Sequence, residues 1–358
     1  MMMTPTNNTP LFYQEKTAFL KSLPLYVSSH PAADTSSSLL DSSPRLVNYL
    51  HHYGLDEVTS TRSQYYAIWQ SPISTAEGTY AIVQQYWQAK TTSDASASAG
   101  TVVIAHGYLD HCGLYGRLIE WSLQQGYDVL CFDLPGHGLS SGEAASIKHF
   151  DTYTDVLEQV LTSHATLSHA TAPNDNTHCR QSLTTPYIAI GQSTGCAVIA
   201  NQLLRQRQIF EHAIFLAPLV RSFQWQWLRY LHKALSPIIH SIRRQCIASS
   251  HDNTFNDFLH NQDPLQTKRI PLTWLGAMDR WQLYCKQQKP TNNNATLAII
   301  QGTQDTTVDW QHNIKTLHRI FPHARIHYAE GAKHHLVNES PDYWNRIAHL
   351  LTLTFKQQ

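Results

Sequence analysis

The chain has 358 residues, of which 42% are hydrophobic and 15% are charged. This apolar content is enough for a large core, which excludes a chain that is disordered as a whole. Because 26 Lys and Arg balance 26 Asp and Glu, no overall positive field attracts nucleic acid, and we expect no nucleic-acid partner.

Six cysteines are scattered along the chain without a C-x-x-C pair. Their spacing indicates neither a zinc cluster nor a dense disulfide framework and favours a reducing compartment, with a single disulfide as the open alternative. The N-terminus reads MMMTPTNNTPLFYQEK and has no signal-peptide pattern. No run of about 18 apolar residues predicts a membrane-spanning helix. We therefore expect a cytoplasmic protein, with peripheral contact with a membrane left open.

The first sixty residues are polar and rich in Ser and Thr, with short amphipathic pieces such as Tyr13 to Leu23. They predict an N-terminal extension that packs on the core only in part. Strands and helices then alternate. Short apolar or alternating runs predict strands at 65–73, 79–90, 101–105, 127–132, 187–190 and 213–217. Helical spacing predicts helices at 115–125, 150–164 and 194–206, and the polar segment 166–186 predicts a surface loop.

The alternation stops at Arg221, and residues 221–294 show several helical stretches and no short apolar strand. Alternation resumes with a strand at 296–300, a helix near 310–320, a strand at 325–329 and a final helix at 341–355. This order predicts an α/β fold with a mostly parallel central sheet, helices on both faces and a helical cap inserted over the sheet's edge. We divide the chain into an N-terminal extension (1–60), a core in two parts (61–220 and 295–358) and the cap (221–294).

A G-x-S-x-G motif, GQSTG at 191–195, stands between a predicted strand and a predicted helix. A sharp turn at this place lifts the serine out of the sheet, and the two glycines avoid side-chain clashes in so tight a turn. The N-terminus of the following helix favours negative charge. We expect Ser193 to be a nucleophile and the backbone N–H of Thr194 to donate to the oxyanion that forms when Ser193 attacks.

The segment HGYLDH at 106–111 follows the predicted strand at 101–105. Its glycine lets the backbone turn beneath the site, and we expect the backbone N–H of Tyr108 to be the second oxyanion donor. We interpret His106 as holding this loop by hydrogen bonds. A structural role is favoured for His111 as well.

A nucleophilic serine needs a base, and the base needs an acid that orients it. Asp305 stands just past the strand at 296–300, where α/β folds build their sites. Its rival Asp309 precedes a helical run, as an N-cap residue does, and we favour Asp305. The loop after the last strand offers His334 and His335 as bases, and chemistry alone does not choose between them.

These motifs together resemble the branch of the α/β hydrolases that contains monoacylglycerol lipases, lysophospholipases and serine aminopeptidases. The resemblance covers about 101–355, apart from 221–294 and 166–186, and is carried in order by HGYLDH, DLPGHGLSSG, GQSTG, GTQDTTVD and GAKHHLVNE. It implies the α/β-hydrolase fold, with a helical cap after the sixth strand that covers the site and selects the substrate.

The resemblance also chooses among the candidate residues. The family's loop usually reads G-A-x-H-E-L, and its histidine, which is the base, matches His334, while the family's acid matches Asp305. The chain departs from this pattern at His335, where Glu is common, so we expect a changed contact beside the base. It also departs at Gln192, where His is common, and at Cys196, which we expect to pack as a small hydrophobe.

Residues 221–294 contain ten Lys and Arg, four Asp and no Glu, and they hold four of the nine Trp. An amphipathic stripe with basic residues runs over 225–247. Such a stripe can lie at an anionic lipid surface, although packing on the core beneath is the more common role. An aminopeptidase would need carboxylates near its pocket for the substrate ammonium, and the predicted cap is poor in them.

We therefore expect a serine hydrolase that cleaves carboxylic esters with an acyl chain, such as a monoacylglycerol or a lysophospholipid, without a metal or an organic cofactor. An aminopeptidase, a thioesterase or a perhydrolase on the same fold is the alternative, because the catalytic residues do not distinguish these reactions. A non-catalytic binding protein is the rival from another class, but such proteins typically lose a catalytic residue.

Overall fold

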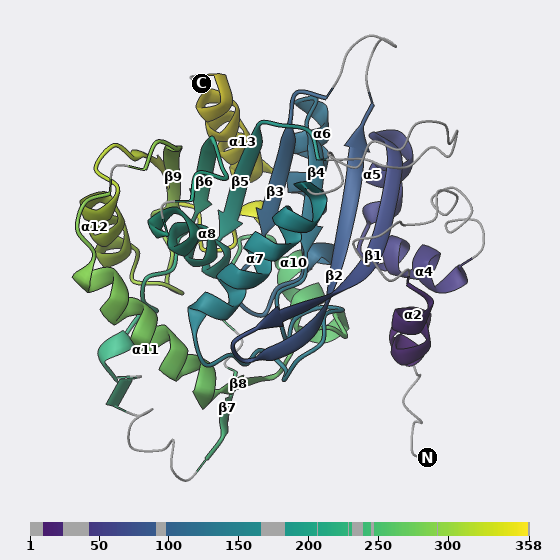
Figure 1. Cartoon of the computed structure of the whole chain (residues 1–358), viewed down its shortest axis with the longest axis horizontal. Helices are drawn as coiled ribbons and strands as arrows, with labels where there is room; N and C mark the ends of the chain where they lie inside the picture. The colour runs from purple at the N-terminus through teal and green to yellow at the C-terminus, as the bar shows by residue number, and fades with distance from the viewer. Residues whose placement is uncertain are drawn as a thin grey trace.

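A computed structural model describes residues 10–23, 43–90, 98–165, 183–205, 207–227, 229–230, 239–244, 247–291 and 293–356. Its centre is an eight-stranded sheet in the order β1-β2-β4-β3-β5-β6-β9-β10, with helices on both faces (Figure 1). The strands are β1 (Ser63–Thr75), β2 (Gly78–Ala89), β3 (Thr101–Ala105), β4 (Asp128–Phe132), β5 (Tyr187–Gln192), β6 (His212–Leu216), β9 (Thr296–Gly302) and β10 (Arg325–Ala329). Within this sheet the β1–β2 and β2–β4 pairs are antiparallel, and the other pairs are parallel. The predicted fold class is confirmed.

The apolar strands in the middle of the sheet explain its two-sided core. All five residues of β3 are buried, as a parallel strand covered on both faces requires. Because successive side chains point to opposite faces, Val103 and Ala105 pack into one hydrophobic cluster, and Val102 and Ile104 pack into the other. One face carries α7 (Phe150–Ala165), α8 (Thr194–Leu204) and α12 (Trp310–Ile320), and the other carries α6 (Gly116–Gln124) and α13 (Pro341–Lys356).

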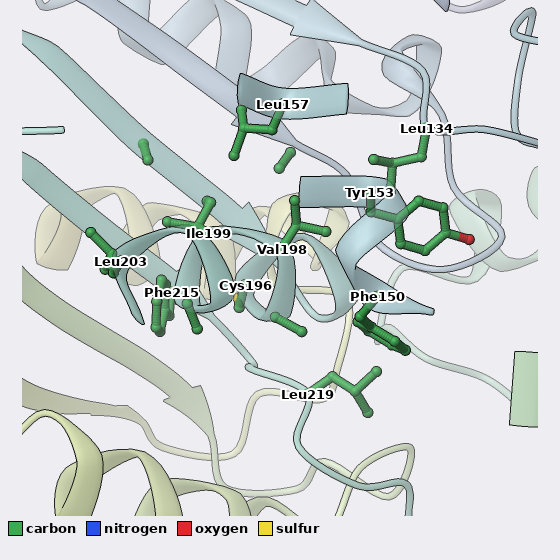
Figure 2. Close-up of a cluster of buried hydrophobic side chains, with 14 of the residues drawn as sticks. Leu134, Phe150, Tyr153, Leu157, Cys196, Val198, Ile199, Leu203, Phe215 and Leu219 are labelled. Atoms are coloured by element: carbon green, nitrogen blue, oxygen red, sulfur yellow. The ribbon is translucent and has the colours of Figure 1, made fainter. Parts of the chain in front are cut away.

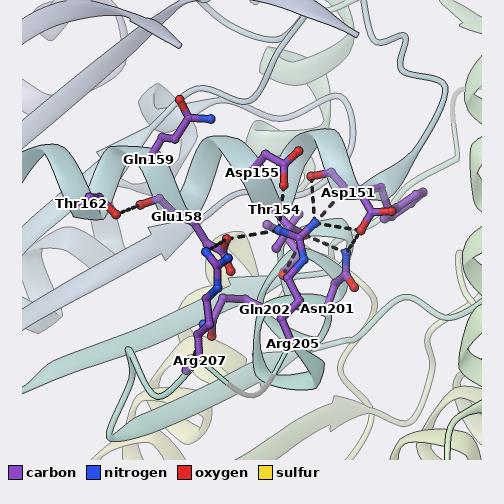
Figure 3. A network of polar contacts seen from close by, with 12 residues as sticks. Asp151, Thr154, Asp155, Glu158, Gln159, Thr162, Asn201, Gln202, Arg205 and Arg207 are labelled. Atoms are coloured by element: carbon purple, nitrogen blue, oxygen red, sulfur yellow. Dashed lines mark hydrogen bonds and ion pairs between the residues drawn. The ribbon is translucent and has the colours of Figure 1, made fainter. Parts of the chain in front are cut away.

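Helix α8 is almost wholly buried, with only Leu204 partly exposed along its length. Its side chains interdigitate with those of α7 and β6 (Figure 2); the labelled residues on these three elements are Phe150, Tyr153, Leu157, Cys196, Val198, Ile199, Leu203 and Phe215. At the end of α8, Arg205 binds three carboxylates of α7: Asp151 at 2.8 Å, Asp155 at 2.7 Å and Glu158 at 3.2 Å (Figure 3). A cation there also interacts favourably with the helix dipole. These contacts hold the helix that begins next to Ser193.

The N-terminal extension packs more closely than its composition predicts. Its described parts form α1 (Leu11–Gln14), α2 (Lys16–Ser22), α4 (Pro44–His52) and α5 (Leu55–Thr61). Ser43 accepts a hydrogen bond from Leu46 N–H, and Pro44 follows it, the usual start of a helix. The side chains of Phe12, Phe19 and Tyr49 are fully buried in the cluster that also contains α6 and α13. The described helices therefore belong to one face of the core.

The segment between β6 and β9 is called the insertion below. The sequence predicts a helical segment here, but the structure also contains two short strands. The insertion contains α10 (Asn253–Asp257), a π-helical turn η3 (Phe258–Gln262) and α11 (Leu272–Gln287), but also an antiparallel pair of β7 (Ser241–Arg243) and β8 (Arg269–Pro271). Three-residue strands are too short to show a periodicity in sequence. Much of the predicted stripe at 225–247, and of the predicted loop at 166–186, lies outside the described residues.

The insertion lies near the carboxyl ends of the parallel strands (Figure 1). The indole N–H of Trp281 on α11 donates to the carbonyl of Leu219, just after β6. The backbone N–H of His335, after β10, donates to the carbonyl of Ser249 in the insertion. Among the described helices, none is both long enough and apolar enough to cross a membrane.

Candidate active site

Ser193 occupies the turn between β5 and α8 in a strained backbone conformation. Its φ of 54° and ψ of −109° lie in a region that non-glycine residues rarely adopt and that is typical of functional positions. The turn is possible because glycines stand two residues before and two residues after Ser193. A Cβ on Gly195 would lie 1.9 Å from the carbonyl oxygen of Ala105, and one on Gly191 would lie 2.6 Å from the nitrogen of Cys196. Cys196 is buried against this turn, with its sulfur 3.0 Å from the carbonyl oxygen of Gly191.

The structure brings Ser193, His334 and Asp305 together in one hydrogen-bonded chain. His334 Nε2 lies 3.0 Å from Ser193 Oγ, and His334 Nδ1 lies 2.7 Å from Asp305 Oδ2. With the proton on Nδ1, the imidazole donates to Asp305 and Nε2 accepts from the Ser193 hydroxyl. All three side chains are buried. Ser193, His334 and Asp305 follow β5, β10 and β9. These strands are parallel, so their carboxyl ends lie at the same end of the sheet.

The two rival residues take other positions. Asp309 accepts a hydrogen bond from His312 N–H as the N-cap of α12, which confirms its predicted role, and it also binds Arg221. His335 is buried beside Asp110, with its Nε2 3.2 Å from the carboxylate Oδ2. The residue at the position of the family's usual Glu therefore lies beside a carboxylate.

Burial and charged or hydrogen-bonded partners act in opposite directions on the pKa values of Asp305 and His334. Burial raises the pKa of Asp305, but the imidazole of His334 and the N–H groups of Thr307 and Val308 outweigh it, so the pKa is lowered. Burial lowers the pKa of His334, but the Asp305 carboxylate outweighs this effect, so the pKa is raised. Asp305 thus stays ionised and stabilises the protonated imidazole.

This shift predicts where activity is lost on acidification. Only the neutral imidazole accepts a proton, so activity falls as the pH falls through the pKa of His334. Because that pKa is raised above its ordinary value of 6.5, the acid limb of kcat/KM is expected to have its inflection above pH 6.5. A profile between about pH 5 and pH 9, with folding monitored at each pH, measures it. An inflection below pH 6.5 in folded protein would contradict the assignment of His334 as the base.

The two expected oxyanion donors lie at the start of α8 and in the loop after β3. Within the described part of the chain, the backbone N–H groups of Thr194 and Tyr108 donate no hydrogen bond, so both are free to receive an acceptor. The loop itself is rigid. As expected, His106 holds it, accepting from Leu134 N–H at 2.9 Å, and Gly107 N–H donates to the Tyr115 hydroxyl at 2.8 Å.

Two positioning contacts escape sequence reasoning. The side chain of Gln192 donates to the backbone carbonyl of His334 at 2.9 Å. Glu339 is fully buried and accepts from the N–H groups of Lys333 at 2.6 Å and His251 at 2.8 Å. Both side chains fix the loop that carries His334. For Gln192, the sequence gives one indication of a special role, which is its departure from the family pattern. For Glu339, no such indication was identified in the sequence. No cluster of His, Cys, Asp or Glu suited to a metal is found among the described residues.

Fold and sequence together define the class of protein. The eight-stranded, mostly parallel sheet with a serine on the turn after β5 is that of an α/β hydrolase. Residues 96–341 match the serine aminopeptidase family, S33. The chain belongs to this family, and the resemblance noted from its motifs is confirmed.

Several relatives show where the chain stands within these hydrolases. A monoglyceride lipase homolog of monkeypox virus is 26% identical over 263 residues, and this aligned region is 72% of this chain and 88% of the relative. A phospholipase of Bacillus subtilis (strain 168) is 23% identical over 255 residues, which is 69% of this chain and 92% of the relative. The solved structure of a soluble variant of a Saccharomyces cerevisiae monoglyceride lipase is similar with a TM-score of 0.63 and 16% identity, over 76% of this chain and 90% of that one.

Proposed function

We propose that the chain is a serine hydrolase that cleaves carboxylic esters of lipids carrying one acyl chain, of the monoacylglycerol or lysophospholipid type. The observation that carries the proposal is the hydrogen-bonded chain of Ser193, His334 and Asp305. The names of the relatives, a monoglyceride lipase homolog and a phospholipase, support lipid esters as the substrate class.

In the proposed mechanism, His334 Nε2 takes the proton of Ser193 as its hydroxyl attacks the ester carbonyl. The N–H groups of Tyr108 and Thr194 donate to the oxyanion of the tetrahedral intermediate. The protonated His334, stabilised by Asp305, then gives its proton to the leaving alcohol. Water attacks the acyl-enzyme in the same way and releases the acid.

The charges of the insertion favour an ester over a substrate that carries an ammonium group. Each of its four carboxylates already has a partner in the structure: Asp252 with Phe255 N–H, Asp257 with Asn261, Asp263 with His111, and Asp279 with Arg229. An aminopeptidase binds the substrate ammonium through carboxylates that are free to receive it. Among the described residues of the insertion, Asp252, Asp263 and Asp279 already face Arg117, His111 and Arg229. This scarcity of unpaired carboxylates supports the role of a cap that selects an acyl chain.

We also propose that this cap makes peripheral contact with lipid. Phe223, Trp227 and Tyr230 are exposed, Trp227 by 77% and Tyr230 by 72%. Exposed aromatic side chains that are close together in the chain are suited to a lipid–water interface.

A labelling and rate experiment tests the proposed function. The wild-type protein is treated with a fluorophosphonate probe, and its rates are compared on acyl esters of graded chain length and on aminoacyl amides. We expect the adduct on Ser193, identified by peptide mass spectrometry, and faster cleavage of the esters. Folded protein that is not labelled would sink the hydrolase assignment, and faster cleavage of aminoacyl amides would sink the ester assignment.

A further inference from the structure

We propose that the insertion positions the oxyanion donor of this site, because Trp274, Gln266 and Asp263 bind the loop 106–111 that carries Tyr108. This inference rests on the proposed function. It assigns the insertion a part in the chemical step that goes beyond covering the site and choosing the acyl chain.

The first contact is a stack of two aromatic rings. The indole of Trp274 on α11 lies parallel to the ring of Tyr108, with centroids 3.6 Å apart and an interplanar angle of 14°. The hydroxyl of Tyr108 donates to the carbonyl of Ala145 at 2.8 Å, so the ring is also held at its far end. Trp274 is buried. Moving α11 away would therefore remove the surface that holds the Tyr108 side chain. The backbone N–H of Tyr108 would then also be held less firmly.

The second contact holds the residue that follows Tyr108. The side-chain amide of Gln266 donates to the carbonyl of Leu109 at 2.7 Å. Leu109 has a φ of 68°, a left-handed conformation that is unfavourable for a non-glycine residue. Such a conformation persists only where surrounding contacts maintain it. Here one of those contacts comes from the insertion.

The third contact closes the loop at its far end. His111 Nε2 lies 3.0 Å from Asp263 Oδ2, and neither side chain is accessible to solvent. The hydroxyl of Tyr53, at the end of α4, donates to the other oxygen of Asp263 at 2.8 Å. The insertion and the N-terminal extension therefore meet next to His111. The loop 106–111 is held to the core through His106, and three residues of the insertion bind its remaining part.

A positioning role and a gating role of the insertion predict different effects on kcat and KM. If the insertion only controls entry, loosening it changes KM and leaves kcat unchanged. If it positions the Tyr108 N–H, loosening it weakens the transition state and lowers kcat. Complete loss of an oxyanion donor costs about 100- to 1,000-fold in kcat, and a donor that is displaced only part of the time costs less.

The test compares three variants on a soluble short-chain ester. Trp274→Ala removes the stacked ring, Trp274→Phe keeps an aromatic ring there, and Trp121→Ala is the control. Trp121 lies on α6, outside the insertion, and is also buried against an aromatic ring, that of Phe355. Two ketone inhibitors with the same acyl chain complete the design. A trifluoromethyl ketone forms a tetrahedral adduct with Ser193 whose oxyanion needs the donors, and the plain methyl ketone binds without that adduct.

We expect Trp274→Ala to lower kcat by about tenfold or more and to weaken the binding of the trifluoromethyl ketone by a similar factor. The binding of the methyl ketone should change by no more than about twofold. Trp274→Phe and Trp121→Ala should keep kcat within about threefold of the wild type. Equal weakening of the binding of both ketones, an effect on KM alone, or an equal loss of kcat in Trp121→Ala would overturn the inference. If Trp274→Ala does not fold, Gln266→Ala is measured in the same way. If a fluorophosphonate does not label the folded wild-type protein, the proposed function itself is overturned. Failure of the proposed function can therefore be distinguished from failure of the positioning role.

Discussion

Replacing Ser193 with Ala is expected to lower kcat on an acyl ester by about 10⁶-fold, the size of loss found when a serine nucleophile is removed from a hydrogen-bonded triad. The reason is that no other hydroxyl can attack, so only the oxyanion donors and substrate binding continue to help water. Stability should change little, because alanine keeps the backbone strain at this turn and removes only a hydroxyl.

The measurement needs a control that separates chemistry from folding. Ser60→Ala, at an exposed position on α5, changes the same atoms far from the site and should leave kcat unchanged. Thermal unfolding of both variants checks that they fold. If Ser193→Ala kept substantial activity in folded protein, Ser193 would not be the nucleophile, and the turn after β5 would have to be explained by structure alone.

Replacing Asp305 with Asn is expected to lower kcat by about 10⁴-fold, although the side chain keeps its shape. An amide that donates to His334 Nδ1 would leave the proton on Nε2, which then cannot accept from Ser193. The amide also carries no negative charge, so the protonated His334 loses the carboxylate that stabilises it. The same variant should be only moderately less stable, because the backbone N–H groups that bind Oδ1 keep an acceptor.

Asp309→Asn is the matched control, four residues along the same loop. Asp309 caps α12 and binds Arg221, and asparagine is also a good N-cap residue. We expect kcat within about twofold of the wild type and a loss of stability of about 1 kcal/mol or less. A larger loss of activity in Asp309→Asn than in Asp305→Asn would reverse the assignment of the acid.

Sequence reasoning succeeded where the signal is local. The buried parallel strand at 101–105 is a short apolar run because both of its faces are covered. The predicted and observed bounds agree for this strand and for the edge strand at 325–329. The turn at Ser193 could be placed because glycine is required on both sides of it. His334 could not be separated from His335 by chemistry, since both are buried near carboxylates. The family pattern made that choice.

The remaining features depend on partners that are distant in sequence. Nothing in Glu339 predicts that it binds the backbone of both Lys333 and His251. The extension looks like a polar segment, yet its few aromatic residues fill a cluster formed by α6 and α13. The pair of β7 and β8 joins two short polar strands across more than twenty residues, so no local pattern marks it.

The place of the insertion in the chain has a consequence for synthesis on the ribosome. Strand β6 pairs with β9 only after everything between residues 217 and 295 has been made, and Ser193 and His334 are 141 residues apart. Closing so long a loop is an entropic cost that local contacts cannot offset. A nascent chain therefore presents Ser193 without His334 while the residues between them are being made, and the hydrogen-bonded chain of Ser193, His334 and Asp305 can form only afterwards.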